Sequence, residues 1–256
     1  MNLIEVNDLH VRYGDFEAVK GVSFSLGKGE ILGIVGESGS GKSTVARTLI
    51  GLQKKSAGSI TFNLQTSTFN LRSKIAMIFQ DAVGSLNPRM TVRQTLEEII
   101  EFSNNRIIES GKRNSRTFDY PIIRLLEIVG LSSAVLDQYP RELSGGQCQR
   151  VSIARALATN PEILVADEPV SALDVSVQAR ILNLLRDLRR DLGLSIILIA
   201  HDLAVVKNVC DRICVMEKGL FVDEGPAAEV FASPKSGYTK RLLSAVPDVV
   251  RSLSRR

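Results

Sequence analysis

The sequence predicts an α/β core that is interrupted by a helical insertion, and two observations lead to this fold class. In the first and last thirds of the chain, short apolar runs of strand length alternate with segments of helical composition. Between them the apolar residues recur at helical spacing, as at Leu96, Ile99 and Ile100. Alternating strands and helices build a mostly parallel sheet with helices on its faces. We therefore expect a single domain over residues 1–256, with helices inserted over residues 84–159.

Local composition predicts the individual strands and helices. Residues 31–35 form an apolar run without periodicity, as expected of a strand that is covered on both faces of the sheet. Further strands are predicted over residues 3–11, 22–26, 59–62, 74–79, 163–166 and 195–200, with a hairpin over 212–216 and 220–224. Helices are predicted over residues 42–50, 148–158, 175–191 and 202–209, and two amphipathic helices are expected at the end of the chain.

Composition excludes several classes of protein. Hydrophobic residues make up 44% of the chain and charged residues 23%, so the chain can form a packed core and is not disordered. No apolar run approaches the ~18–20 residues needed to cross a bilayer, so we expect neither a secreted nor a membrane-spanning chain. The net charge of +4 is too small to indicate nucleic acid. Cys148, Cys210 and Cys214 lack the spacing of a disulfide framework and the fourth ligand of a zinc site.

Residues 36–43 read Gly-Glu-Ser-Gly-Ser-Gly-Lys-Ser and fit the phosphate-loop pattern G-x-x-x-x-G-K-[ST] between a strand and a helix. The glycines let successive backbone N–H groups converge on one point, at which the following helix also directs its positive end. Lys42 adds an ammonium for the β- and γ-phosphates, and the Ser43 hydroxyl is suited to ligate Mg²⁺. A serine-hydrolase elbow is excluded, because neither Ser38 nor Ser40 has a glycine two residues away on both sides.

Two acidic residues follow the strand predicted over residues 163–166. Ligands of open α/β sheets gather at the carboxyl ends of the strands, so we expect Asp167 near the phosphate loop, holding Mg²⁺ directly or through water. Glu168 would be directed at the γ-phosphate, where a carboxylate orients a water molecule and accepts its proton. The alternative is a helix N-terminus that favours acidic residues.

Two further polar side chains follow strands of the same predicted sheet. The imidazole of His201 could hydrogen-bond the γ-phosphate, and the amide oxygen of Gln80 could reach Mg²⁺ or the attacking water. The candidate catalytic residues are therefore Glu168, His201 and Gln80. The candidate Mg²⁺ ligands are Ser43, Gln80 and Asp167.

A second anion-binding helix end is predicted inside the insertion. Residues 143–147 read Leu-Ser-Gly-Gly-Gln and precede a predicted helix. Ser144 is a good N-cap, and the two glycines expose the helix N–H groups. Plain capping is the alternative. The separation of this segment from the phosphate loop favours pairing with a nucleotide that is bound by another molecule.

These motifs, in this order, resemble the nucleotide-binding subunit of ATP-binding-cassette (ABC) transporters from about Leu3 to the C-terminus. The phosphate loop is similar to the family's Walker A motif, residues 163–167 to its Walker B strand and residues 143–147 to its LSGGQ signature. The resemblance implies an α/β fold with a P-loop NTPase ABC ATPase core, an antiparallel β subdomain and an inserted α-helical subdomain. The implied division assigns the core and β subdomain to residues 1–83 and 160–235, the helical subdomain to 84–159 and a C-terminal helical tail to 236–256.

The resemblance also implies the roles of individual residues. Tyr13 takes the position of the aromatic ring that stacks on adenine, Gln80 that of the Q-loop and His201 that of the switch histidine. ATP with Mg²⁺ would be held by Tyr13 and by Gly36, Glu37, Ser38, Gly39, Ser40, Gly41, Lys42, Ser43 and Thr44. A partner's ATP would be covered by Ser144, Gly145, Gly146 and Gln147. A D-loop formed by Ser171, Ala172, Leu173 and Asp174 would lie at the dimer interface.

Finer features are similar to the peptide and nickel importers, and to the second of their two ATPase subunits. Residues 85–91, Ser-Leu-Asn-Pro-Arg-Met-Thr, and an ending that contains Tyr238-Thr239 are typical of that group. Asp81-Ala-Val departs from the commoner Asp-Pro after the glutamine, and Cys148 stands where a longer side chain is usual. The chain stops at Arg256, before the cysteine-bearing extension of longer relatives, so no iron–sulfur cluster is predicted.

The resemblance implies an ATP-hydrolysing motor that couples uptake of oligopeptides, or of nickel and other metal chelates, to ATP. The expected partners are a second, paralogous ABC ATPase subunit, two transmembrane permease subunits and, through them, an extracellular or periplasmic substrate-binding protein, but no nucleic acid. The expected location is peripheral, at the cytoplasmic face of the inner membrane.

Two alternative functions are a soluble ABC-type ATPase that acts on nucleic acid or ribosomes, and a module that binds ATP without cleaving it. The presence of Glu168 and His201 argues against the second.

Overall fold

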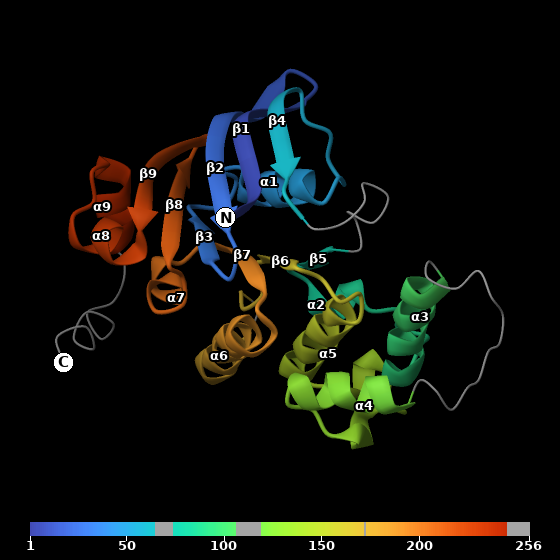
Figure 1. Ribbon diagram of the computed structural model, residues 1–256. Helices are drawn as coiled ribbons and strands as arrows, with labels where there is room; N and C mark the ends of the chain where they lie inside the picture. Colours follow the sequence, from blue (N-terminus) through green and yellow to red (C-terminus); the bar gives the residue numbers. More distant parts are fainter. Residues whose placement is uncertain (65–73, 106–118, 172, 245–256) are drawn as a thin grey trace.

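The computed structural model describes residues 1–64, 74–105, 119–171 and 173–244, and its strands form two sheets (Figure 1). One is antiparallel, in the order β2-β1-β4, with β1 (Asn2–Tyr13), β2 (Phe16–Gly27) and β4 (Ala57–Phe62). The other has the order β5-β6-β7-β3-β8-β9, with β5 (Ile75–Ile78), β6 (Ile163–Asp167), β7 (Ser195–Ala200), β3 (Ile31–Val35), β8 (Arg212–Glu217) and β9 (Leu220–Pro226). Only the β8–β9 pair of this second sheet is antiparallel, as the predicted hairpin requires.

The helices fall into three groups along the chain. Helix α1 (Lys42–Leu49) follows β3. Between β5 and β6 come α2 (Ala82–Ser85), α3 (Val92–Asn105), α4 (Asp119–Ile128), two 3₁₀ turns (Ser133–Val135 and Pro140–Glu142) and α5 (Gly145–Leu157). The last group is α6 (Val175–Leu192), α7 (Leu203–Lys207), α8 (Ala227–Ala232) and α9 (Gly237–Ser244).

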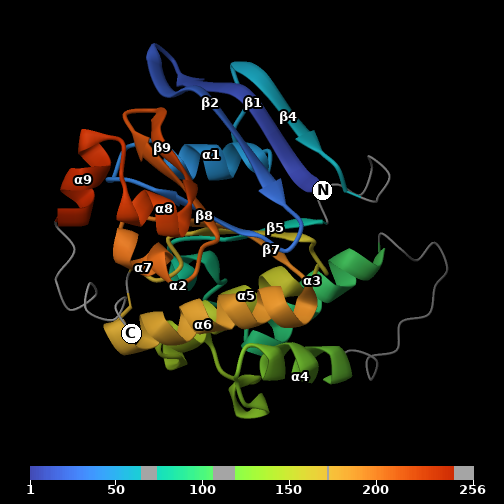
Figure 2. The ribbon, with the colours of Figure 1, turned by 60° about the vertical axis from the view of Figure 1, so that its left-hand side comes forward.

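The six-stranded sheet separates two hydrophobic cores. In β3, Leu32 and Ile34 point into a core shared with α1 and the antiparallel sheet, whereas Ile31 and Val35 point into the core beneath α5 and α6. All five residues of β3 are buried, as are those of β6 and β7. Figure 2 shows this layering, with α1 on one side of the sheet and α5 and α6 on the other. The sheet needs no alternation of polar residues because both of its faces are covered.

The inserted helices pack through apolar residues, and those of α3 include Leu96 and Ile100, whose spacing predicted a helix. Leu96 and Ile100 of α3, and Ile122 and Leu126 of α4, are buried in the same core as α5. These helices extend away from the sheet edge formed by β5 (Figure 1). The insertion therefore shares a continuous apolar core with the strands while it presents a separate surface.

Three details differ from the sequence-based expectations. The strands β1 and β2 each span 12 residues, longer than predicted, because they pair with one another along most of their length. Helix α5 begins at Gly145 instead of residue 148, since Ser144 caps it. The Ser144 hydroxyl accepts the N–H of Gln147 at 3.3 Å, and the Gln147 side chain accepts the N–H of Ser144 at 2.8 Å. Helix α7 is shorter than predicted and begins after Asp202, whose carboxylate accepts the N–H of Ala204.

Within the described residues, no helix combines the length and the apolar character that crossing a membrane requires. The two helices expected near the end of the chain are present as α8 and α9, and residues 245–256 of the predicted tail lie outside the described residues.

Candidate nucleotide site

The phosphate loop connects the carboxyl end of β3 to α1, and its glycines are required by close contacts. Gly36 has φ +156° and Gly41 has φ +111°. A Cβ atom at Gly36 would collide with the carbonyl oxygen of Met216 on β8. By contrast, a Cβ at Gly39 would meet nothing within 4 Å, so this part of the loop borders open space. The loop is thus pressed against β8 on one side and open on the other.

Lys42 provides a buried positive charge inside this loop. The residue is 3% exposed, and its ammonium donates to the Glu37 carbonyl at 2.8 Å and to the Ser40 hydroxyl at 3.5 Å. Burial lowers the pKa of this amine, and the nearby carboxylates of Glu168 and Asp167 oppose that effect. The two groups that accept its hydrogen bonds are neutral, so an anion bound in the loop would form a direct charged contact with the ammonium.

Ser43, at the start of α1, meets Asp167 at the carboxyl end of β6. The Ser43 hydroxyl donates to Asp167 at 2.9 Å, although the two residues are 124 positions apart. Asp167 is 3% exposed, and burial raises the pKa of its carboxyl, with a further increase from the charge of Glu168. A hydroxyl and a carboxylate are oxygen ligands of the kind that Mg²⁺ prefers.

Glu168 accepts hydrogen bonds from two of the predicted catalytic residues. Gln80 donates its amide to the Glu168 carboxylate at 3.1 Å, and Nδ1 of His201 lies 3.1 Å from the same oxygen. Glu168 has φ +47°, an uncommon conformation for a residue with a side chain, and its N–H donates to the carbonyl of Ile199 on β7. Backbone strain of this kind is concentrated at functional sites.

Lys42, Ser43, Gln80, Glu168 and His201 line one cavity of about 340 Å³, whereas Asp167 lines the larger cavity described below. The lining comprises Tyr13, Phe16, Ala18, Ser38, Gly39, Gly41, Lys42, Ser43, Thr44, Gln80, Glu168 and His201. The structure therefore brings together phosphate-loop residues, Tyr13 and the three predicted catalytic residues. The donor set fits a triphosphate with Mg²⁺, because backbone amides, a buried ammonium and carboxylate and hydroxyl oxygens converge on one opening.

Sequence reasoning missed Phe16 and Ala18 in this cavity. Tyr13 and Phe16 are paired across the tight turn between β1 and β2, which bends at Gly14 with φ +58°. Both rings are exposed, at 44% for Tyr13 and 65% for Phe16. The signal was present in the sequence as Tyr-Gly-Asp-Phe, a turn that sets two aromatic residues opposite each other.

The LSGGQ segment does not line this cavity. Its residues Ser144 to Gln147 form the start of α5, which lies against α6 of the same chain, where a Cβ at Gly146 would come within 2.7 Å of Val177. A Cβ at Gly145 would lie 3.5 Å from Leu173 of the predicted D-loop. Two segments that the sequence predicted at a dimer interface are therefore neighbours in one protomer.

The D-loop leads directly into α6. Asp174 caps that helix by accepting the N–H of Val177 at 3.0 Å and the Ser176 hydroxyl at 2.7 Å. These hydrogen bonds, that from Ser176 above all, hold the pKa of Asp174 below its ordinary value. The Ser171 hydroxyl donates to the Glu168 carbonyl at 3.2 Å, which ties the loop to the cavity. Ala172 lies outside the described residues.

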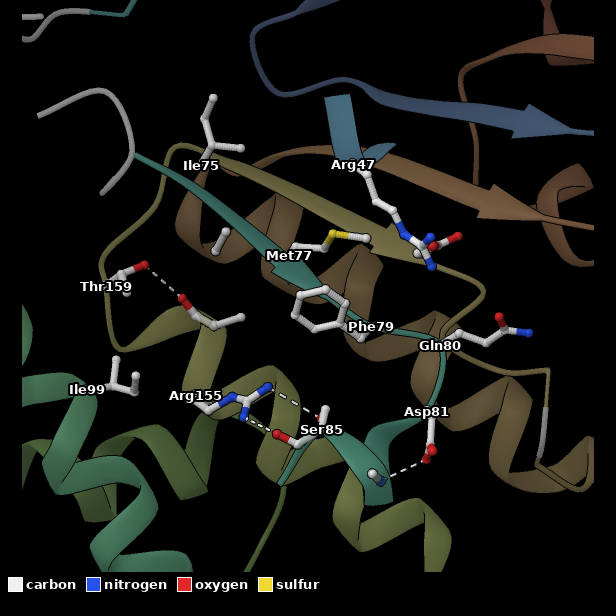
Figure 3. Close-up of a pocket in the computed structure, with 14 residues that line it drawn as sticks. Arg47, Ile75, Met77, Phe79, Gln80, Asp81, Ser85, Ile99, Arg155 and Thr159 are labelled. Atoms are coloured by element: carbon white, nitrogen blue, oxygen red, sulfur yellow. Dashed lines mark hydrogen bonds between the residues drawn. The ribbon is translucent and has the colours of Figure 1, made fainter. Parts of the chain in front are cut away.

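A second, larger cavity of about 840 Å³ lies along β5, and its lining includes residues of the inserted helices, Arg47 of α1 and Asp167 of β6 (Figure 3). Gln80 and Asp81 line it at the end of β5, and Arg155 of α5 lies across from them. The Arg155 guanidinium donates to the Ser85 carbonyl at 2.6 Å and to its hydroxyl at 3.3 Å. These bonds join the segment after Gln80 to the helix that begins with LSGGQ.

The fold and this site define the class of the protein, a phosphate-loop ATPase cassette. A family model described as "ABC transporter" matches residues 19–171, and the chain belongs to the ABC transporter family. ATP and Mg²⁺ are the ligands of the ATPases of this family, which agrees with the donor set of the cavity.

The chain is similar to curated oligopeptide transport ATP-binding proteins. It is 46% identical to OppF of Lactococcus lactis subsp. lactis over 248 residues, which are 93% of this chain and 76% of the relative. It is 46% identical to AppF of Bacillus subtilis (92% and 72% covered) and 43% identical to OppF of Escherichia coli (96% and 78% covered).

Solved cassette structures share its fold. The structure of cbiO1 from Clostridium perfringens, part of the ABC transporter complex cbiONQ, superposes with a TM-score of 0.77 at 28% identity, covering 99% of each chain. A dimeric post-hydrolysis state of the ATP-binding cassette MJ0796 bound to ADP and Pi gives 0.74 at 28% identity, covering 88% of this chain and 98% of that one.

The contact between Gly36 and Met216 predicts a large effect of a single methyl group. In Gly36→Ala the Cβ would force the loop away from β8, so we expect nucleotide binding to be lost and the unfolding free energy to fall by more than ~2 kcal/mol. Gly29→Ala is the matched control, because Gly29 also has a positive φ (+67°) but has nothing within 4 Å. Titration with ATP and chemical denaturation test this. Equal destabilisation of the two variants with binding retained would contradict it.

Proposed function

We propose that this chain is an ATP-hydrolysing subunit of an oligopeptide importer. The observation that carries this proposal is the meeting of Gln80, His201 and Glu168 beside the Ser43–Asp167 pair, in one cavity with the phosphate loop. The similarity to OppF and AppF proteins supports the choice of cargo. A role on nucleic acid or ribosomes has no comparable support.

We assign the phosphate contacts to the loop and the magnesium contacts to oxygen ligands near it. Residues 36–44 would surround the β- and γ-phosphates, with phosphate contacts from backbone amides other than those of Glu37 and Ser40, which donate to the Tyr238 hydroxyl and the Glu37 carbonyl. The Lys42 ammonium would neutralise phosphate charge inside the loop. Ser43, Gln80 and Asp167 would hold Mg²⁺, which when bound neutralises phosphate charge. Tyr13 would stack on the base, and its exposed ring is accessible for that contact.

Glu168 is the proposed general base. Its carboxylate has a side-chain exposure of 13%, whereas His201 beside it has 52%, so the base is shielded while its partner reaches solvent. Gln80 and His201 both contact the same carboxylate oxygen, Oε2, which fixes its direction. A carboxylate held in this way orients a water molecule and accepts its proton during attack on the γ-phosphate.

The site is completed by a second cassette in this proposal. Because Ser144, Gly145, Gly146 and Gln147 lie outside the cavity of their own chain, their exposed helix start would cover the nucleotide of a partner. Leu173 and Asp174 next to them would contribute to the same interface. We propose a paralogous ATPase as the partner, since the chain is similar to one of two subunit types.

We also propose how the chain divides. Residues 1–83 and 160–235 would form the core with the antiparallel β subdomain, residues 84–159 the helical subdomain and residues 236–256 the tail.

The larger cavity along β5 would receive a permease segment, and Gln80 lines both this cavity and the nucleotide site. Two permease subunits would hold the chain peripherally at the cytoplasmic face of the membrane. An external substrate-binding protein would deliver the cargo.

Glu168→Gln tests the general base. The amide cannot accept the proton of the attacking water, so we expect ATP to bind with unchanged affinity and kcat to fall at least ~100-fold. Glu162→Gln is the control, because Glu162 adjoins the opposite end of the same strand and pairs with Lys74 on the surface. Phosphate release and equilibrium binding are measured for both. Unaltered hydrolysis by Glu168→Gln would remove the assigned base.

Ser144→Arg tests the contribution of the LSGGQ segment to a partner's site. We expect ATP binding by each chain to persist and hydrolysis by the assembled pair to stop, because the arginine fills the contact surface. Ser144→Ala separates this effect from loss of the helix cap, which costs ~1 kcal/mol. If the arginine variant hydrolyses ATP normally in the assembled transporter, the partner site is elsewhere.

The cargo is tested with the complete transporter in lipid vesicles. This subunit and ATP are enclosed in the vesicles, and the binding protein is outside. We expect external oligopeptides to stimulate phosphate release and to accumulate inside. Nickel chelates serve as the competing cargo and should leave both rates at the basal level. Stimulation by a nickel chelate but not by any peptide would reject the proposed cargo.

A further inference from the structure

The phosphate loop makes a hydrogen bond with a helix from the far end of the chain. The backbone N–H of Glu37, the residue after Gly36, donates to the phenolic oxygen of Tyr238 on α9 at 2.9 Å. These residues are 201 positions apart. Tyr238 is 5% exposed, so its hydroxyl reaches the loop from a buried position.

The neighbouring hairpin supports the same side of the loop. Gly219, in the turn between β8 and β9, donates its N–H to the Ser40 carbonyl at 2.9 Å. Met216 of β8 supplies the carbonyl that faces Gly36. Tyr238, Gly219 and Met216 therefore contact the loop at Glu37, Ser40 and Gly36, whereas Gly39 borders open space. The C-terminal quarter of the described chain therefore shapes one wall of the loop.

Helix α9 is itself fixed to this hairpin by an internal carboxylate. Asp223 of β9 is 5% exposed, and it accepts the N–H groups of Lys235 at 3.1 Å and Ser236 at 2.9 Å. The Ser236 hydroxyl in turn accepts the N–H of Tyr238 at 3.0 Å. The position of the phenol thus depends on a chain of hydrogen bonds that begins in the sheet.

Tyr238 also contacts Arg241, which lies three residues further along α9. The Arg241 guanidinium lies 5.7 Å from the centre of the Tyr238 ring and forms an ion pair with Glu217 of β8 at 3.7 Å. Burial raises the pKa of the Tyr238 phenol, so the hydroxyl is neutral at physiological pH and its oxygen accepts from Glu37 without adding negative charge beside the phosphate site.

We propose that Tyr238 is a positioning residue for the phosphate loop, and that docking of α9 through this hydroxyl sets the affinity of the loop for nucleotide. The inference rests on the proposed function, because it assigns the loop to nucleotide binding. A loop that is held in its binding conformation before the ligand arrives loses less conformational freedom on binding. Removing the hydroxyl therefore weakens binding, although Tyr238 need not touch the nucleotide.

Tyr238→Phe tests this, because it keeps the buried ring and removes only the acceptor. We expect the Kd for ATP and the KM of the assembled ATPase to rise about five-fold, which corresponds to one hydrogen bond, while kcat is unchanged. Amide hydrogen exchange at Glu37 should be faster by a similar factor in nucleotide-free protein. That second measurement requires no nucleotide, so it distinguishes failure of this inference from failure of the proposed function.

Thr239→Val is the matched control on the same helix. Thr239 is fully buried, and within the described part of the chain its hydroxyl has no hydrogen-bond partner, so its removal should leave ATP binding and Glu37 exchange at wild-type values. Thermal unfolding of both variants checks that α9 remains folded. If Tyr238→Phe binds ATP and exchanges at Glu37 like the wild type, or if both variants weaken binding equally, the positioning role of the hydroxyl is refuted.

Discussion

The close approach of the phosphate loop to β8 is the constraint on which the rest of the site depends. Gly36 lies so near the Met216 carbonyl that only glycine fits, and this contact fixes where the loop turns into α1. Once the loop is fixed, the Lys42 ammonium is enclosed, and Ser43 at the start of α1 reaches Asp167. The parallel register of β3, β7 and β6 then sets the distance between loop and acidic residues.

The same register explains why Glu168 is the meeting point of the catalytic candidates. Gln80 follows β5, Glu168 follows β6 and His201 follows β7, and these three strands are adjacent in the sheet. Adjacent parallel strands end at the same edge of the sheet, so the Gln80 amide and the His201 imidazole can both reach the Glu168 carboxylate. The positive φ of Glu168 represents backbone strain that the surrounding sheet must balance.

Gln80 and Arg155 connect the nucleotide cavity to the inserted helices. Gln80 lines both the nucleotide cavity and the cavity beside β5, and Arg155 joins the segment after Gln80 to α5. The hydrogen bonds of Arg155 to Ser85 therefore link the segment after Gln80 to the helix whose N-terminus carries LSGGQ. On the opposite side, Tyr238 connects α9 to the loop. The site is therefore held from two sides, by the segment that leads into the inserted helices and by α9.

The sequence by itself determined the phosphate loop, the acidic pair after β6, the parallel core and the helical character of the insertion. These features depend on local patterns, because apolar runs, glycine spacing and caps act over a few residues. Only the tertiary structure decided that Phe16 joins Tyr13 in the cavity, that Glu168 lies between Gln80 and His201, and that Tyr238 reaches Glu37. Those contacts join residues that are far apart in the chain, and their geometry depends on strand order and side-chain direction, which composition and spacing do not encode.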